Sequence, residues 1–179
     1  TAAICIAVGL AAQDILKNVF GGITILFEHT FQKGDKIRIR EHYGEVIKMG
    51  LRSTRIKTDD DSVVSIPNSE ILNNAVYNSN SGEPNCHVVA EIYLPVDINT
   101  TRAREIAIEA AKVSRYIYLN KPITVIFINE VKGRKSYLNM RLKAYVMDFE
   151  YESALKSEMT EIVIRELLRE GLISKDTTV

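Results

Sequence analysis

The chain has 179 residues, of which 46% are hydrophobic and 26% are charged, and its formal net charge at pH 7 is zero. This length suffices for one or two small globular domains, and the balanced charge gives no sign of bulk affinity for nucleic acid. Two cysteines are too few for a disulfide framework, which fits a reducing cytoplasmic setting.

The chain begins with an apolar segment in which small side chains predominate. Residues 2–12 are all apolar, and these eleven residues would rise only about 16 Å as a helix. The hydrocarbon core of a bilayer is about 30 Å thick. We therefore expect either a tightly packed helix of a bundle or the carboxyl-terminal half of a membrane span. Thr1 in place of an initiator methionine favours a chain that begins within such a span.

A helical wheel gives this segment distinct faces. Ile6 and Leu10 share a narrow stripe, whereas Ile4 and Val8 point roughly the opposite way. Small residues border the stripe on both sides: Ala3 and Ala7 on one, and Ala2, Cys5 and Gly9 on the other. Because small residues let helix backbones approach closely, such a helix can have identical neighbours on both flanks. The pattern predicts a ring of helices with Ile6 and Leu10 facing its axis, which is the wall of a pore.

An amphipathic helix is expected next, over residues 14–30. Gln13 and Asp14 end the apolar run, and Asp14 can cap the amino terminus of a new helix. We therefore predict a kink or restart of the helix at these two residues. The apolar stripe of the second helix comprises Leu16, Val19, Phe20, Ile23 and Phe27.

Residues 31–78 have the pattern of a small β domain. Gly34 and Asp35 mark a turn, after which Ile37 and Ile39 alternate with charged residues as in a strand. The acidic run at 59–61 is interpreted as a solvated hairpin turn, since a calcium loop would need a glycine and a distal glutamate. Strands are expected at 36–40, 45–49, 53–57 and 62–66, within a bent sheet of five.

The β domain is expected to end in a capped segment and a linker. Pro67 ends the last strand, and the side chains of Asn68 and Ser69 are expected to cap a short segment at 70–73. Residues 79–86 are polar, contain glycine and proline and lack periodicity. They are predicted to link two domains.

Residues 87–179 have the pattern of a ferredoxin-like α/β domain. Asn99 can cap a helix that ends near Tyr116, and Gly171 can end a second helix over residues 152–170. The resulting order, βαββα, is that of a ferredoxin-like layer, so the whole chain is predicted to be α+β. The strands are expected at 87–94, 124–131 and 136–146, with a hairpin turn at 132–135.

Nothing in the sequence indicates catalysis. His29, His42 and His87 lack the spacing of metal ligands, both to one another and to a cysteine. We find neither a nucleophile turn nor a glycine-rich phosphate loop after a strand. The sequence therefore predicts no enzyme, no metal site and no cofactor.

Basic residues are concentrated between Lys33 and Lys57, where eight Lys and Arg stand against three acids. Such a cluster can be an RNA-binding face, the positive side of a membrane protein or a set of solvated strand edges. The RNA interpretation lacks paired aromatic residues of the kind that stack bases, and it leaves the first helix unexplained.

Two stretches of the sequence together resemble one known family. They are GLAAQDILKNVFGGITILFEHTFQKGDKI at residues 9–37 and GEVIKMGLRSTRIKTDDDSVVSIPNSEIL at residues 44–72. They resemble the end of the pore helix and the following domain of the small-conductance mechanosensitive channel (MscS) family. The residues that carry the family motif are Gly34, Asp35, Gly44, Pro67, Asn68 and Ser69.

The resemblance implies a heptamer in which each chain supplies one pore helix, with residues 1–13 as its carboxyl-terminal half. Ile6 and Leu10 match the two pore-constricting positions of the family. The β domain would have an Sm-like fold, joined side by side to its neighbours in a ring. Asp14 stands where the family commonly has glycine, so a glycine hinge is not expected there. The final strand of the family, which closes a narrow barrel, is not evident in residues 172–179.

The predicted function is a mechanosensitive ion channel of the plasma or inner membrane, opened by tension and serving osmotic-downshock relief. Residues after about 14 would lie in the cytoplasm. The expected partners are further copies of the chain, membrane lipid and permeating ions, with no nucleic acid. Two alternatives remain open: a soluble Sm-like RNA-binding ring and a non-channel membrane scaffold.

Overall fold

The computed structural model of the protein describes residues 2–133 and 135–174. It divides the chain into two compact units, Thr1–Glu83 and Pro84–Val179. An amino-terminal helix and two antiparallel sheets make up these units. The predicted α+β fold class is confirmed.

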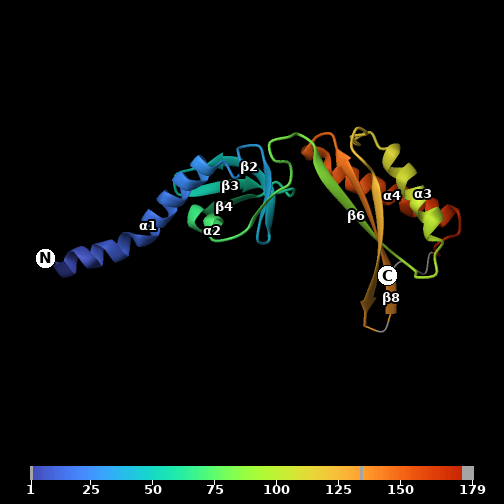
Figure 1. The fold of residues 1–179 in the computed structure, drawn as a ribbon, viewed down its shortest axis with the longest axis horizontal. Coiled ribbons are helices and arrows are strands. Elements are labelled where there is room, and N and C mark those ends of the chain that lie inside the picture. Colours follow the sequence, from blue (N-terminus) through green and yellow to red (C-terminus); the bar gives the residue numbers. More distant parts are fainter. Residues whose placement is uncertain (1, 134, 175–179) are drawn as a thin grey trace. The chain divides into compact units, whose positions relative to one another are not determined.

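The first unit begins with a single helix, α1, Ala2–Glu28. The predicted restart of the helix at Gln13 and Asp14 is therefore wrong, whereas a kink there stays a prediction. Neither residue removes a helical hydrogen bond, and each lowers helix propensity by only a few tenths of a kcal/mol. The Asp14 carbonyl also accepts a bond of 2.8 Å from Asn18 Nδ2. The ribbon of α1 changes direction along its length without interruption (Figure 1).

An antiparallel sheet of five strands follows, in the order β4-β3-β2-β1-β5. Between β4 and β5 the chain forms the short helix α2, Asn68–Leu72. The predicted strand at 53–57 is reproduced, and the others shift at their ends by one to three residues. The strands are β1 Lys36–Ile39, β2 His42–Met49, β3 Ser53–Lys57, β4 Val63–Pro67 and β5 Val76–Asn78.

The core of this unit is formed by the inward residues of the sheet together with the end of α1. Alternate residues of β3 are buried, as expected for a strand with one covered face. A side chain at Gly44 would place its Cβ 2.3 Å from the Lys57 carbonyl oxygen, so this crossing of strands requires glycine. The buried apolar residues are Ile25, Phe31, Ile37, Ile39, Val46, Ile56, Ile66 and Ile71.

The acidic run forms the turn of the β3–β4 hairpin, as predicted. Asp61 has a positive φ of 60°, and its carboxylate lies 2.7 Å from Lys57 Nζ. Asp59 lies 2.8 Å from the Nζ of Lys36, a side chain that is almost fully buried. Two of the three aspartates therefore neutralise lysines of the same unit.

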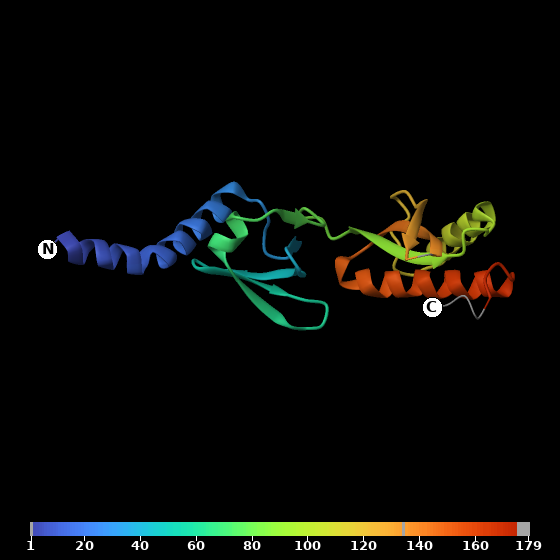
Figure 2. The same cartoon turned by 90° about the horizontal axis from the view of Figure 1, so that it is seen from below.

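The second unit is an antiparallel sheet in the order β6-β8-β7 with two long helices. Helix α4 packs against β6, and α3 packs against α4 and β7; Figure 2 shows α4, in red, running along the sheet. The order βαββα matches the ferredoxin-like prediction. The elements are β6 Cys86–Leu94, α3 Thr100–Lys112, β7 Thr124–Lys132, β8 Lys135–Val146, the 3-10 turn η1 Phe149–Tyr151 and α4 Glu152–Arg169.

The core of the second unit is formed by alternate residues of its strands and by every fourth residue of α4. Every second residue of β6 from Cys86 to Leu94 is buried. Helix α4 buries one residue in each turn, which is the stripe expected of a helix that covers a sheet. Its buried residues are Leu155, Met159, Val163 and Leu167.

Both helices of the second unit have recognisable ends. The Asn99 side chain accepts a bond from the Arg102 amide and caps α3, as predicted. Helix α3 ends at Lys112 rather than near Tyr116, because the chain there pairs with β8: the Tyr118 amide donates to the Tyr145 carbonyl at 2.7 Å. Helix α4 is followed by Gly171, whose φ of 69° favours glycine.

Candidate pore segment and helix-docking site

The first half of α1 contacts nothing else in the described chain. Ile4, Ile6, Val8 and Leu10 are each between 62 and 70% exposed. The helix is long and apolar enough to cross a membrane, and none of its most apolar stretch is buried against the rest of the chain. Because the four side chains are equally exposed, a single chain does not distinguish a lumen face from an outer face. The assignment of Ile6 and Leu10 to the constriction stays a prediction.

The small residues of this half are equally free. Ala2, Ala3 and Ala7 are exposed, and no atom outside the helix backbone lies within 4 Å of a Cβ placed on Gly9. The side chain of Cys5 lies outside the described residues. The proposed packing faces therefore have space for neighbours that this chain does not supply.

The second half of α1 docks on the β unit through a face that sequence reasoning did not identify. Gly21, Gly22 and Ile25 are buried, and at about 100° per residue Asn18 belongs to the same face. The predicted apolar stripe lies on the opposite side, with Phe20 64% and Phe27 81% exposed. The amphipathic helix thus presents its large apolar side chains outward and its small residues to the fold.

Two glycines allow this close approach. A Cβ on Gly22 would lie 2.4 Å from the Leu51 carbonyl oxygen and 2.5 Å from Asn68 Nδ2, and a Cβ on Gly21 would lie 3.1 Å from the Asn68 backbone. Glycine inside a helix costs about 0.5–1 kcal/mol relative to alanine. Adjacent glycines in an otherwise helical pattern were the signal that could have revealed the contact.

Asn68 is the centre of the contact on the side of the β unit. It is fully buried, and its Nδ2 donates to the carbonyls of Gly50 and Leu51 at 2.9 and 3.0 Å. Its Oδ1 accepts a bond of 3.1 Å from Thr54 Oγ1. Asn68 therefore satisfies the turn before β3 and does not cap a helix with its side chain, contrary to the prediction.

The cap of α2 comes instead from α1. Asn18 Oδ1 accepts bonds of 3.0 Å from the Ser69 amide and 2.9 Å from Ser69 Oγ. Pro67, the residue before α2, makes no capping hydrogen bond with its side chain. The predicted capping by Asn68 and Ser69 is therefore corrected: the motif residues receive α1, and Asn18 holds them.

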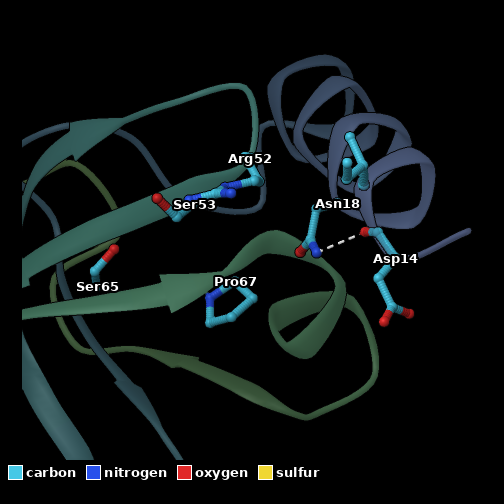
Figure 3. Close-up of a pocket in the computed structure, with 7 residues that line it drawn as sticks. Asp14, Asn18, Arg52, Ser53, Ser65 and Pro67 are labelled. Atoms are coloured by element: carbon cyan, nitrogen blue, oxygen red, sulfur yellow. Dashed lines mark hydrogen bonds between the residues drawn. The ribbon is translucent and has the colours of Figure 1, made fainter. Parts of the chain in front are cut away.

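A polar crevice of about 340 Å³ lies beside this contact. Figure 3 shows Asn18 of α1 directed towards Pro67, and Asp14, Arg52, Ser53 and Ser65 also line the crevice. No catalytic arrangement is present there: the groups are one acid, one base, an amide and hydroxyls. Among the described residues, no group of three or more His, Cys, Asp or Glu could hold a metal ion.

The Gly34–Asp35 part of the motif lies elsewhere, at the start of β1. Gly34 has a φ of 93°, which favours glycine. Asp35 is 3% exposed and accepts hydrogen bonds from the Gln32 amide, Asn78 Nδ2 and the Gly82 amide. The motif thus serves two separate places, the docking of α1 and the start of the segment after β5.

The basic cluster of the β unit does not form one free cationic face. Lys36 pairs with Asp59 as described, and the guanidinium of Arg38 lies 5.0 Å from the centre of the Tyr43 ring. Arg40 lies 3.3 Å from a Glu70 oxygen. These residues are engaged within their own unit, as is the exposed Lys57, which pairs with Asp61. The other exposed basic residues are Lys33, Lys48, Arg52 and Arg55.

Charged groups also order the surface of the second unit. Arg102 Nε donates to Glu170 at 2.7 Å, and this bond lowers the pKa of the Glu170 carboxyl and raises that of the Arg102 guanidinium. Burial, and then the charges of Lys143 and Arg141, lower the pKa of His87. Arg102 and Glu170 line a groove of about 270 Å³ beside α3 and α4, whereas His87 lies on strand β6.

Sequence comparisons identify the class of the β unit. The family described as "Mechanosensitive ion channel, beta-domain" matches residues 14–81. The small-conductance mechanosensitive channel MscMJ of Methanocaldococcus jannaschii is 30% identical over 173 residues, which cover 93% of this chain and 47% of that protein. The miniconductance mechanosensitive channel MscM of Escherichia coli is 26% identical over 163 residues, covering 91% of this chain and 14% of that protein.

Solved structures show the same fold. The closed-state structure of Helicobacter pylori MscS matches with a TM-score of 0.71 at 21% identity, over 94% of this chain and 65% of that one. The structure of Arabidopsis thaliana MSL1 matches with a TM-score of 0.62 at 22% identity, over 95% of this chain and 62% of that one.

Fold and sequence agree on the family of this chain. The chain belongs to the MscS family. The chain spans about half or less of the length of the two curated relatives, which are named as channels and not as enzymes.

Proposed function

We propose that the protein is a mechanosensitive ion channel, opened by membrane tension and serving osmotic-downshock relief. The observation that carries the proposal is the free first half of α1. Its large apolar side chains are 62–70% exposed in the single chain, yet the same helix continues into a half that is fixed to a folded unit. Exposed apolar surface of this extent marks contact with membrane or protein. The names of the relatives support a channel.

The proposed assembly is a ring of seven identical chains, with one α1 from each chain around a common axis. Ile6 and Leu10 would face that axis as two apolar rings, in a lumen too narrow and apolar to stay wet. The small faces at Ala3, Ala7 and Gly9 would let neighbouring helices pack closely. The protein would lie in the cell membrane with residues after about 14 in the cytoplasm, in contact with lipid and permeating ions and without nucleic acid.

Gating would then be a two-state equilibrium. Tension favours the state that occupies more membrane area, by an amount set by the difference in area. The docked half of α1 limits how the pore helix can move, because the backbone at Gly21 and Gly22 packs directly against Asn68. A change of tilt in the first half must therefore bend α1, carry the β unit along or separate the two at Asn18.

Patch recording of the full-length protein in liposomes tests the proposal. We expect channels that open with increasing suction and close on its release, from protein whose native mass is that of a closed ring, with seven copies expected. An intact ring that passes no tension-dependent current would contradict the proposed channel function. A monodisperse monomer or dimer would contradict the pore architecture.

A further inference from the structure

The segment after β5, which the sequence suggests is a linker, is folded onto the β unit by one buried carboxylate. Asp35 Oδ2 accepts bonds of 3.0 Å from the Gln32 amide and 2.7 Å from Asn78 Nδ2. Asp35 Oδ1 accepts a bond of 2.9 Å from the Gly82 amide. The three donors come from before β1, from β5 and from the linker itself. A single side chain therefore joins the linker to the start of the sheet.

Asn80 continues this attachment. It is 8% exposed, and its Oδ1 accepts a bond of 2.8 Å from the Lys36 amide. Its Nδ2 donates to the Glu83 carbonyl at 2.7 Å, and the Glu83 amide donates back to the Asn80 carbonyl at 2.9 Å. The chain is thus hydrogen-bonded to the first unit as far as Glu83.

The next residue, Pro84, is hydrogen-bonded to the second unit. The Pro84 carbonyl accepts a bond of 2.9 Å from the Phe149 amide, and β6 begins at Cys86. Proline has a fixed φ and disfavours the helical region for the residue before it. The predicted linker at 79–86 is therefore largely absorbed into the two units, and the boundary between them falls between Glu83 and Pro84.

We infer that Asp35 is a positioning residue that confines the pivot between the two units to the Glu83–Pro84 junction. Its carboxylate suits this role because it supplies two acceptor oxygens to three donors and donates none itself. Without it, the Gly82 amide and the Asn78 side chain lose their partner, and residues 79–83 join the pivot. A further consequence rests on the proposed function: in the channel, a short pivot would transmit a rotation of the β unit to the second unit.

Amide hydrogen exchange of the full-length protein in detergent, read by mass spectrometry, tests the attachment. We expect Asp35→Ala to accelerate exchange in residues 79–83 by about tenfold or more, which is the loss of one or two hydrogen bonds. Exchange in α1 and β3 should stay unchanged. The matched control is Asp60→Ala, which removes an exposed acid in the β3–β4 turn and should leave the segment protected. Unchanged exchange in residues 79–83 of Asp35→Ala would overturn the inference.

The pivot itself is tested by the spread of distances between two spin labels, one in each unit. The labels replace the exposed Lys48 and Lys156 in labelled chains diluted with unlabelled ones, with Cys5 changed to alanine. Asp35→Ala should broaden the distance distribution, whereas Asp60→Ala should not. Faster exchange without broadening would reduce Asp35 to a residue that stabilises its own unit, which contradicts the positioning role.

A second variant keeps the test decisive if Asp35→Ala does not fold. Asp35→Asn keeps the size of the side chain and one acceptor oxygen, but it replaces the other acceptor with a donor and so breaks part of the attachment. It should also broaden the distances, and a distribution as narrow as that of the wild type would overturn the inference. Neither measurement needs channel activity. A protein that passes no current but shows both effects would retract the proposed function and keep the role of Asp35.

Discussion

The two halves of α1 belong to one helix but meet opposite environments. In residues 2–11 every described side chain is exposed, whatever its size. In the second half, Gly21, Gly22 and Ile25 are buried while Phe20 and Phe27 are exposed. The first half leaves its apolar side chains exposed in the single chain, whereas the second half makes a contact within the chain.

The difference shows that small residues have two distinct uses in this helix. In the second half the structure shows what they do: they bring the helix backbone against Asn68 and Leu51. In the first half no partner is seen, and Gly9 has open space around it. A test of each half therefore needs a different measurement, stability of the chain for the second and assembly or conduction for the first.

The largest expected effect lies in the first half, at Leu10. Leu10→Ser would place a ring of hydroxyls in the lumen, wet it, and remove about 1–3 kcal/mol of apolar burial from each chain. Because the change repeats around the ring, the channel should open at clearly lower tension in patch recordings, and cells should grow poorly.

Two controls accompany Leu10→Ser. Leu10→Ile is similar in volume and polarity and should gate nearly normally. Ile4→Ser lies on the other side of the helix and should not cause the same leak. An unchanged threshold in Leu10→Ser would mean that another face of α1 lines the pore.

The next effect contrasts glycines of the two halves. Gly22→Ala places a methyl group 2.4 Å from the Leu51 carbonyl and 2.5 Å from Asn68 Nδ2, and overpacking of this kind costs about 1–3 kcal/mol. Disturbing the buried bonds of Asn68 adds about 1–3 kcal/mol. Urea unfolding of the purified chain should show a loss of about 2–6 kcal/mol.

Gly9→Ala is the matched control. It meets no neighbour in the chain and should leave stability unchanged or raise it by up to about 1 kcal/mol through helix propensity. In the assembled channel the order should reverse, with Gly9→Ala altering assembly or gating. Equal stability losses for the two variants would remove the distinction between the halves.

This contrast also marks how far the sequence alone could go. The strand at residues 53–57 and the helix from Glu152 followed the periods of their apolar residues, and the structure places both where they were expected. Those elements bury their apolar face inside their own unit, so the usual rule of apolar residues inside applies.

The same rule fails for α1. The rule would place the apolar stripe with Leu16, Phe20 and Ile23 inside the unit, but these side chains are exposed, and the small residues on the opposite side are buried. Apolar side chains in this helix face surroundings that the chain does not contain. Local patterns predicted only a cap at Asn68 and Ser69 and a turn at Asp35. The long-range bonds of these residues were not predicted, because the partners are 14 to 51 residues away in the sequence.

A smaller effect is expected where the two halves meet, at Asn18. Asn18→Ala removes the acceptor for the Ser69 amide and hydroxyl and should lower the free energy of unfolding by about 1–2 kcal/mol in urea titration. Asn18→Asp keeps an acceptor oxygen at the same place, so most of the stability should return. If the aspartate variant is as unstable as the alanine variant, the bonds to Ser69 do not hold the helix.

The smallest effect concerns the outward side of the second half and sharpens the comparison furthest. Phe20 is 64% exposed and Ile25 is 2% exposed, although both lie in the docked half of the helix. In urea unfolding of the purified chain, Phe20→Ser should change stability by less than about 0.5 kcal/mol, as is usual for surface positions. Ile25→Ala should lower it by about 2–5 kcal/mol through loss of core packing.

In full-length protein in liposomes Phe20 should matter more, because the apolar side opposite the docked face would then be covered. A Phe20→Ser channel with wild-type threshold and stability would show that this side of the second half has no partner, and that only the first half of α1 depends on contacts from outside the chain.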